Sequence, residues 1–544
     1  LKGTTIGTVT DATGHYFLKN LPEGNFVMEV SSVGYKTITR SVTLKKGKTL
    51  EENFELEEDA IALDGVVVSA NRNETTRRMA PTLVNVVDLK LFESTNSSTL
   101  SQGLNFQPGV RVETNCQNCG FQQVRINGLD GPYTQILIDS RPVFSALSGV
   151  YGLEQIPASM IERVEVMRGG GSALFGSSAI AGTINIITKE PLRNSGQLSH
   201  TITGFSGGNS FDNNTSLNLS LVTDDHRAGV YIFGQNRHRS GYDYDGDGFT
   251  ELPKLKNQTV GFRSYFKTST YSKLTFEYHH LQEFRRGGDM LNRPPHEANI
   301  AEQLEHAIDG GSLKFDYFSP NEKHRFSVFT SAANTDRDSY YGGGHDPNAY
   351  GKTTDFTVMG GTQYMYSFGR CLFMPADLTA GLEYNRDHLE DNMWGYNRHT
   401  EQTVNIYSGF LQNEWKNEKW GILLGGRLDK HNMVDHVIFS PRANLRFNPT
   451  KDVNFRLSYA SGFRAPQAFD EDMHIENVGG TVSMIERAKG LKEEKSQSLS
   501  ASADMYRRFG AWQVNLLVEG FYTALKDVFV LGPYEDRGLS LIHI

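Results

Sequence analysis

The second half of the chain alternates apolar and polar residues over most of its length. From about residue 195 onward, every second position is apolar across strand-length runs, as at 217–221, 453–459 and 499–505. A period of two predicts β-strands with one face on each side of a sheet. In a membrane β-barrel the apolar face meets lipid and the polar face lines the lumen. A soluble sandwich rarely sustains the pattern for about 350 residues, which favours the membrane barrel. We expect about 15 such strands.

Two kinds of connection separate these runs. Short polar turns fall at 223–226, 319–324 and 448–452, and long polar loops are expected at about 284–303 and 462–494. Short turns at one rim and long loops at the other are typical of outer-membrane barrels. The spacing therefore predicts a partial barrel wall over 191–544.

The first 190 residues follow a different pattern. Short strands broken by Gly, Pro and Asp turns predict a small β-sandwich over 1–58. An acidic stretch opens a linker at 59–79, and residues 80–190 mix a short helix with several strands. The predicted fold class is an all-β membrane barrel combined with an α/β unit and an N-terminal β-sandwich.

Composition narrows the classes of function. The chain is 22% charged and has 54 Gly, 32 Phe and 23 Tyr, which suits many short strands and turns. Its net charge of −9 provides no basic surface for nucleic acid. No run of about 18 apolar residues offers a transmembrane helix. Because the chain begins at Leu1 without Met and ends soon after a strand-like run, we expect truncation at both ends.

Residues 80–190 carry several short motifs in a fixed order. They are Q-P-G-V at 107–110, R-I-N-G at 125–128, I-L-I-D-S-R-P at 136–142, I-E-R-V-E-V at 161–166 and R-G-G-G-S-A-L-F-G at 168–176. In this order they resemble the plug domain of TonB-dependent outer-membrane receptors. One departure is Asn127, where the family usually has a second small motif beginning Arg-Gly. The resemblance implies an α/β plug in the lumen of a 22-stranded barrel, so about seven strands are missing here.

The first domain also resembles a known module. Its T-D-x-x-G-x-[FY], L-P-x-G and V-G-Y elements are similar to those of the carboxypeptidase-regulatory-like domain, a non-catalytic appendage. No peptidase constellation accompanies them. Because the receptor resemblance implies transport in which no bond of the cargo is made or broken, we predict that the chain is not an enzyme.

A β-branched run follows the acidic linker. It comprises Asp64, Gly65, Val66, Val67, Val68, Ser69 and Ala70. One interpretation is a further sandwich strand. The other is an exposed strand that adds to the edge of another protein's sheet through main-chain hydrogen bonds. The run resembles a TonB box, which implies that it binds TonB.

Two loops correspond, through the resemblance, to the substrate-facing apex of the plug. Their candidate contact residues are Thr114, Asn115, Gln117, Asn118, Phe121, Phe144 and Tyr151. The alternative is a stiffened loop that touches no substrate. Cys116 and Cys119 form a CxxC in the first loop, for which an exported protein favours a local disulfide. Binding of a soft metal such as copper is the other hypothesis.

Four charged residues lie on or beside one strand of this unit. They are Glu162, Arg163, Glu165 and Arg168. A solvated face is the simpler interpretation. The resemblance implies instead that plug charges pair with opposite charges lining the barrel and exchange them for water when the plug is pulled. Surface-like ion pairs contribute only about 0–1 kcal/mol each.

Two further motifs indicate ligands. Asp243, Asp245 and Asp247 copy the start of a calcium loop, but Lys254 stands where an EF-hand has Glu. A calcium-stiffened outer loop and a plain acidic turn both stay open. F-R-A-P at 463–466 resembles a box found in haem and other receptors, with His474 as a candidate axial ligand, although the companion N-P-x-L element is absent.

The resemblance implies TonB-dependent import of a scarce nutrient across the outer membrane. Iron chelates (a siderophore or haem) and cobalamin lead, and copper or a glycan is the alternative within the same architecture. A non-transporting surface β-protein or adhesin is the alternative outside it. The expected partners are TonB with its inner-membrane energising complex, outer-membrane lipid, a small metal chelate and, for a glycan importer, a surface lipoprotein. The plug and first domain would face the periplasm, and no cofactor is required.

Overall fold

A computed structural model describes most of the chain. It covers residues 1–10, 14–19, 21–31, 35, 37–56, 66–142, 153–205, 210–468, 473–474, 484–488, 490–510, 512–534 and 538–543. Within this part of the chain, no helix is both long and apolar enough to span a membrane.

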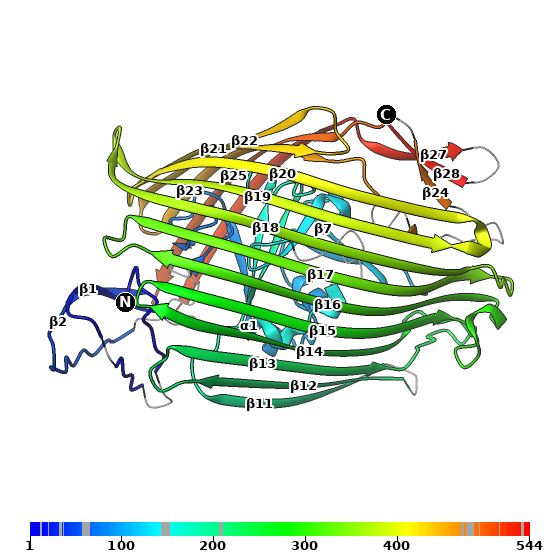
Figure 1. The fold of residues 1–544 in the computed structure, drawn as a ribbon, viewed down its shortest axis with the longest axis horizontal. Helices are drawn as coiled ribbons and strands as arrows, with labels where there is room; N and C mark the ends of the chain where they lie inside the picture. The colour runs from blue at the N-terminus through cyan, green and yellow to red at the C-terminus, as the bar shows by residue number, and fades with distance from the viewer. Residues whose placement is uncertain are drawn as a thin grey trace.

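Fifteen long strands form one antiparallel sheet in which each strand pairs with the next along the chain. They are β11 (Ser195–Gly204), β12 (Phe211–Val222), β13 (Ala228–Arg239), β14 (Lys254–Ser269), β15 (Ser272–Gly288), β16 (Ile300–Phe318), β17 (His324–Gly343), β18 (Tyr350–Cys371), β19 (Met374–Met393), β20 (Arg398–Lys416), β21 (Trp420–His431), β22 (Val437–Thr450), β23 (Val453–Arg464), β25 (Glu494–Phe509) and β26 (Trp512–Lys526). The sheet curls around the smaller elements, and β11 and β26 are its two edges (Figure 1). The predicted strand number is confirmed.

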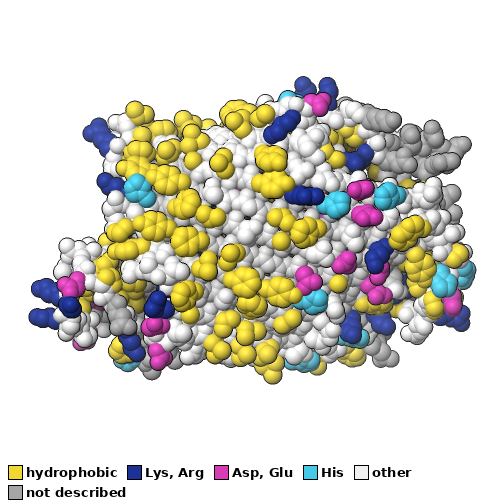
Figure 2. Space-filling model, viewed as in Figure 1, with side chains coloured by type: hydrophobic (Ala, Val, Ile, Leu, Met, Phe, Trp, Pro, Cys, Tyr) yellow, Lys and Arg dark blue, Asp and Glu magenta, His cyan; other side chains and the backbone are white. Residues whose placement is uncertain are grey.

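The sheet, called the wall below, is apolar outside and polar inside. On β12, Leu217 and Leu221 are 43% and 53% exposed, whereas Asn218 and Ser220 are 7% and 5% exposed. Figure 2 shows hydrophobic side chains spread over the outer face, with many of the charged ones towards its two ends. This inside-out distribution is the one that a lipid-facing barrel requires.

The two rims of the wall differ. At one rim the connections are short, as at 270–271, 372–373 and 451–452. At the other rim they include the long connections 240–253 and 465–493. The predicted loop at 284–303 is shorter than expected, because β15 continues to Gly288 and β16 begins at Ile300.

Inside the wall lies a compact unit, called the plug below. Its mixed sheet has the order β5 (Val84–Asp88), β9 (Ile161–Arg168), β10 (Gly182–Thr188) and β8 (Thr134–Ile138), with β10 and β8 parallel. A hairpin of β6 (Val110–Cys116) and β7 (Phe121–Ile126) and helices α1 (Leu89–Ser94), α2 (Leu100–Leu104) and α4 (Ser172–Phe175) complete it. Its core continues into Tyr231 and Phe233 of β13, so plug and wall share one hydrophobic cluster.

The first domain lies at the short-turn rim (Figure 1). Its described part contains the pair β1 (Gly24–Val30) and β2 (Ile38–Leu44). The Thr5 amide donates to the Thr270 carbonyl at 2.9 Å, in the turn between β14 and β15. Shorter elements are β3 (Val66–Val67), β4 (Thr75–Thr76), β24 (Met484–Arg487), β27 (Phe529–Tyr534), β28 (Gly538–His543), η1 (Gly131–Tyr133), η2 (Ala158–Met160), η3 (Pro295–Glu297) and η4 (Trp394–Tyr396).

Candidate functional site

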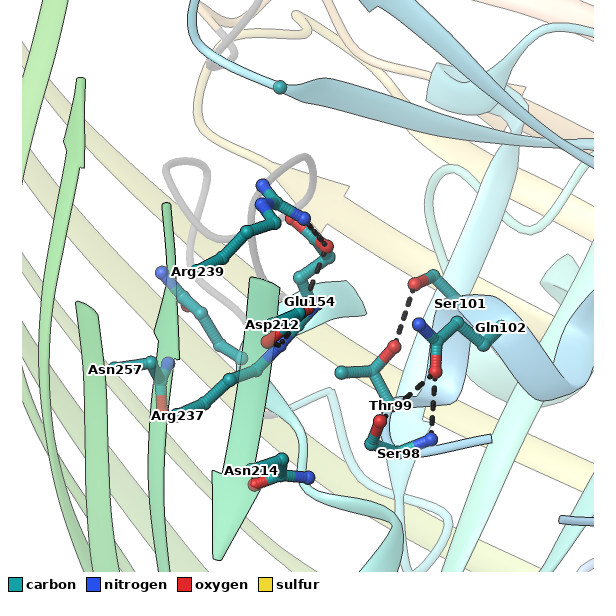
Figure 3. Close-up of polar contacts among 12 residues, drawn as sticks. Ser98, Thr99, Ser101, Gln102, Glu154, Asp212, Asn214, Arg237, Arg239 and Asn257 are labelled. Carbon is teal, nitrogen blue, oxygen red and sulfur yellow. Dashed lines mark hydrogen bonds and ion pairs between the residues drawn. The ribbon is translucent and has the colours of Figure 1, made fainter. Parts of the chain in front are cut away.

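Buried ion pairs hold the plug against the inner face of the wall. The carboxylate of Glu154, a plug residue, lies 2.7 Å from Arg285 of β15 and 3.5 and 3.4 Å from Arg237 and Arg239 of β13. Figure 3 shows Arg237 and Arg239 reaching from the wall towards Glu154, with Asp212 beside Arg237. The sequence motifs did not reveal this cluster. The sequence signal that could have indicated it is the pair of arginines at alternate positions of β13, on the face that points into the lumen.

The cluster fixes the charge of its central carboxylate. Burial alone raises the pKa of Glu154, but the three arginines more than offset it and hold that pKa well below its usual range. Glu154 is therefore ionised at neutral pH. Removing one member of such a buried, hydrogen-bonded set costs much more than losing a surface pair.

Further pairs join plug and wall around the interface. Arg263 of β14 contacts Asp139, and Arg168 contacts Glu519 of β26. Arg168 is the one predicted plug charge for which the structure shows a wall partner. Arg163 instead pairs with Glu165 at 2.9 Å within β9, so the prediction that these two pair with the wall is wrong. Glu162 is exposed.

The segment Val66–Asn73 is threaded between plug and wall. Val67, Ser69 and Ala70 are fully buried, which contradicts the predicted exposed strand. Arg442 of β22 donates to the Ala70 carbonyl at 3.0 Å, and Asn71 donates to Glu414 at 2.6 Å. Asp64 and Gly65 lie outside the described residues. The buried part of the predicted TonB box therefore has many partners in this state.

A single plug carboxylate organises this segment. Glu165 is fully buried and accepts hydrogen bonds from the amides of Val68 and Ser69, both at 2.9 Å. It also accepts one from the Ser69 hydroxyl at 2.7 Å. A side chain that accepts three hydrogen bonds is held firmly in place. Glu165 therefore acts as a latch that holds the segment against the plug.

The β6–β7 hairpin carries most of the predicted apical residues. Thr114, Asn115 and Gln117 are exposed, whereas Asn118 is half-buried and Phe121 is buried. Phe144 and Tyr151, the remaining predictions, lie outside the described residues. The hairpin tip touches the wall on the long-loop side, where Arg285 donates to the Gly120 carbonyl at 3.5 Å. Gly120 has a φ of +69°, a left-handed conformation that favours glycine.

Cys116 and Cys119 are both thiols in the structure, so the predicted disulfide between them is not formed. Their partners explain the difference. Cys116 Sγ lies 3.0 Å from a carboxylate oxygen of Glu302 on β16, and Cys119 Sγ lies 3.8 Å from Nε2 of His474. His474 Nε2 is 3.3 Å from the same Glu302 oxygen. The structure thus places His474 beside thiols, where the sequence had suggested a haem ligand.

The groups of this cluster shift one another's pKa values. Hydrogen bonds to Cys119 and His474 lower the pKa of Cys116 to about 6, against the effect of burial. Burial alone lowers the pKa of His474, but hydrogen bonds to Cys116 and Glu302 raise it to about 10. The two shifts run in opposite directions, favouring loss of the proton from Cys116 and its retention on His474.

The acidic turn at 243–247 gains Glu251 as a fourth carboxylate, and one oxygen of each of the four lies within 4.8 Å of the others. Several of these oxygens already accept hydrogen bonds from backbone amides. For example, Asp243 Oδ1 accepts one from the Gly246 amide at 2.7 Å. The calcium site at Asp243, Asp245 and Asp247 stays a prediction.

A cavity of about 190 Å³ separates plug and wall on one side. Gln123, Gln135 and Ser178 line it from the plug, and Asn385 and Asp387 line it from the wall. Its lining mixes polar and apolar side chains, unlike the shared apolar core at β13. The interface is therefore tightly packed in one sector and open in another.

A small domain held by ion pairs inside a curled, lipid-facing wall defines a plugged β-barrel. Family comparisons agree with this class. The TonB-dependent Receptor Plug Domain matches residues 76–183, the TonB dependent receptor-like beta-barrel matches 181–539, and the CarboxypepD_reg-like domain matches 1–68. The chain belongs to the TonB-dependent receptor family.

Solved structures share the fold. The siderophore receptor PirA from Acinetobacter baumannii has a TM-score of 0.72 at 17% identity, covering 86% of this chain and 76% of that one. A ferric enterobactin receptor (PfeA) mutant from Pseudomonas aeruginosa, in complex with enterobactin, has a TM-score of 0.70 at 18% identity, covering 86% and 77%. The vitamin B12 transporter BtuB of Vibrio vulnificus is 37% identical over 125 residues, 23% of this chain. That match spans only 20% of BtuB's length.

Proposed function

We propose that the protein imports a scarce nutrient across the outer membrane of a Gram-negative cell, driven by TonB. The long-loop rim faces outside, and the first domain and the start of the plug face the periplasm. A ligand binds at the apical hairpin, and TonB then pulls on residues 64–70. Pulling displaces the plug and opens a path through the lumen. No bond in the cargo is made or broken.

One observation carries this proposal. Residues 66–73 run between plug and wall and are latched to the plug through Glu165. A force applied to this segment is transmitted directly to β9, in the middle of the plug sheet. The contacts that then break are mostly polar, and water in the lumen can replace them. The cavity between plug and wall leaves one sector of the plug without direct wall contacts.

The cargo is a metal chelate in this proposal, with a siderophore, haem or cobalamin as the leading classes. One relative is named as a siderophore receptor, a second as a ferric enterobactin receptor and a third as a vitamin B12 transporter. The exposed amide and hydroxyl groups of Thr114, Asn115 and Gln117 offer hydrogen bonds to such a ligand without binding its metal directly.

Deletion of residues 64–70 from the full-length receptor tests the proposal. Cells carry the wild type, the deletion, or a deletion of residues 45–51, which has equal length, as the matched control. Uptake of ferric enterobactin, haem and cyanocobalamin is measured, with binding to whole cells measured in parallel. We expect uptake of one of these probes to vanish in the first deletion only, while its binding persists. Undiminished uptake, or binding of all three probes without any uptake by the wild type, overturns the proposal.

A further inference from the structure

The donor atoms of four side chains converge at the outer end of the plug. They are two thiols from the β6–β7 hairpin (Cys116 and Cys119), the carboxylate of Glu302 on β16, and the imidazole of His474. One such atom from each residue lies within 4.8 Å of all the others. Three segments far apart in the sequence therefore supply one cluster.

The distances are close to those around a bound metal ion. Tetrahedral zinc with bonds of about 2.0–2.3 Å places its ligand atoms about 3.3–3.8 Å apart. Two separations lie in this range, 3.3 Å for Glu302 to His474 and 3.8 Å for His474 to Cys119. The third, 3.0 Å for Cys116 to Glu302, is shorter. Little rearrangement is needed to admit an ion at the centre.

The surroundings hold the ligands in place and exclude water. Cys119 is fully buried, and the side chains of Glu302 and His474 are 12% and 14% exposed. The rings of Tyr341 and Phe121 meet the His474 imidazole edge-on, at centroid distances of 4.9 and 5.8 Å. The Glu302 carboxylate is buried beside two ionisable thiols, and buried anionic groups are normally paired with a cation or bound to a metal.

We infer that Cys116, Cys119, Glu302 and His474 bind one thiophilic metal ion, Zn(II) or Cu(I), which fastens the plug hairpin to the wall. Two thiolates and an imidazole suit both ions, whereas the carboxylate favours zinc. Ferric iron prefers oxygen ligands, so this site is separate from the capture of an iron chelate. The inference is independent of the cargo that the receptor imports.

The test uses full-length receptor, purified in detergent under reducing conditions and stripped of metal. Zn(II) and Cu(I) are titrated separately against chromophoric chelators. We expect one equivalent of at least one ion to bind tightly. Replacing a ligand in Cys116→Ser, Cys119→Ser or His474→Asn should weaken binding by about 100-fold or more, since changes behind the ligands alone cost about 10–100-fold. Glu302→Gln should weaken Zn(II) more than Cu(I).

The control is Cys371→Ser, at the opposite rim in the last position of β18, which should bind as the wild type does. The thermal melting of each metal-free variant shows whether it folds. Cobalt(II) adds a second readout, because a thiolate-to-cobalt absorption should appear in the wild type and fade in either cysteine variant. Equal affinity in the ligand variants and Cys371→Ser overturns the inference. So does a Cys116–Cys119 disulfide in receptor alkylated directly in intact cells.

Discussion

Neutralising Glu154 should loosen the plug without altering its shape. The carboxylate faces three wall arginines, with Arg285 at 2.7 Å, Arg239 at 3.4 Å and Arg237 at 3.5 Å. Glu154→Gln keeps the size of the side chain and an acceptor oxygen, so it isolates the contribution of the charge.

The magnitude follows from the partners that remain. Arg237 keeps Asp212 at 2.6 Å, and Arg285 keeps Glu283 at 2.6 Å. Removing one member of a buried ion pair costs about 3–5 kcal/mol. Because two of the three arginines retain a carboxylate partner, we expect a cost at the low end of this range, about 3 kcal/mol. That corresponds to a roughly 100-fold rise in the fraction of receptors whose plug is displaced.

The assay follows plug unfolding in urea by ionic conductance through full-length receptors in planar bilayers. Glu154→Gln should conduct at a lower urea concentration than the wild type. Glu162→Gln, which changes an exposed plug carboxylate, is the control. Its free energy of plug unfolding should stay within about 0.5 kcal/mol of the wild-type value. Equal urea midpoints for the two variants would refute the role assigned to Glu154.

The same variant has a defined pH dependence. A carboxylate with a depressed pKa contributes stability above its usual pKa of 4.5 and loses that contribution as the pH falls towards the depressed value. The difference in the free energy of plug unfolding between wild type and Glu154→Gln should therefore stay constant from about pH 8 to about pH 5. It should narrow only in stronger acid. A difference that already narrows near neutral pH would mean that Glu154 is not ionised in the interface.

Three further predictions concern the latch, the outer face and the apical hairpin. Glu165→Gln should release the buried segment and increase capture by the periplasmic domain of TonB without ligand, by about 10-fold for a loss of about 1.4 kcal/mol; equal capture by Glu165→Gln and wild type contradicts the latch. Leu217→Arg should destabilise folding into vesicles by about 2–4 kcal/mol, unlike Asp224→Arg in a short turn, and equal effects would place β12 away from lipid. Gly120→Ala adds a Cβ 3.1 Å from Arg285 and Pro253 at a left-handed φ, so metal affinity should fall by about 10-fold; unchanged affinity would show that the hairpin tolerates the shift.

Much of the architecture could be predicted from the sequence. The strand-length alternation on β12 and β23 encodes both the strand and the face that meets lipid, because the side-chain period of a strand is two. The motifs around Arg168 likewise predicted the plug. These signals are local, so a single sequence contains them in full.

The partners of the buried polar groups could not be predicted. Glu302 is 186 positions from Cys116, and His474 is 355 positions from Cys119, so only the folded wall brings them together. The exposed strand predicted at Val66–Ala70 was wrong for the same reason. Its β-branched pattern is that of an edge strand, but the carboxylate that buries it, Glu165, comes from β9.

A reversible cross-link between plug and wall tests the central claim most directly. A Cβ added at Gly170 of the plug would lie 2.8 Å from Cβ of Ala460 on β23, close enough for a disulfide after a small shift. Full-length receptor with Gly170→Cys and Ala460→Cys is compared with each single variant for uptake of ferric enterobactin, haem and cyanocobalamin. We predict that oxidation abolishes uptake but not binding, and that reduction restores it. Normal uptake through the oxidised, cross-linked receptor would contradict a plug that must move.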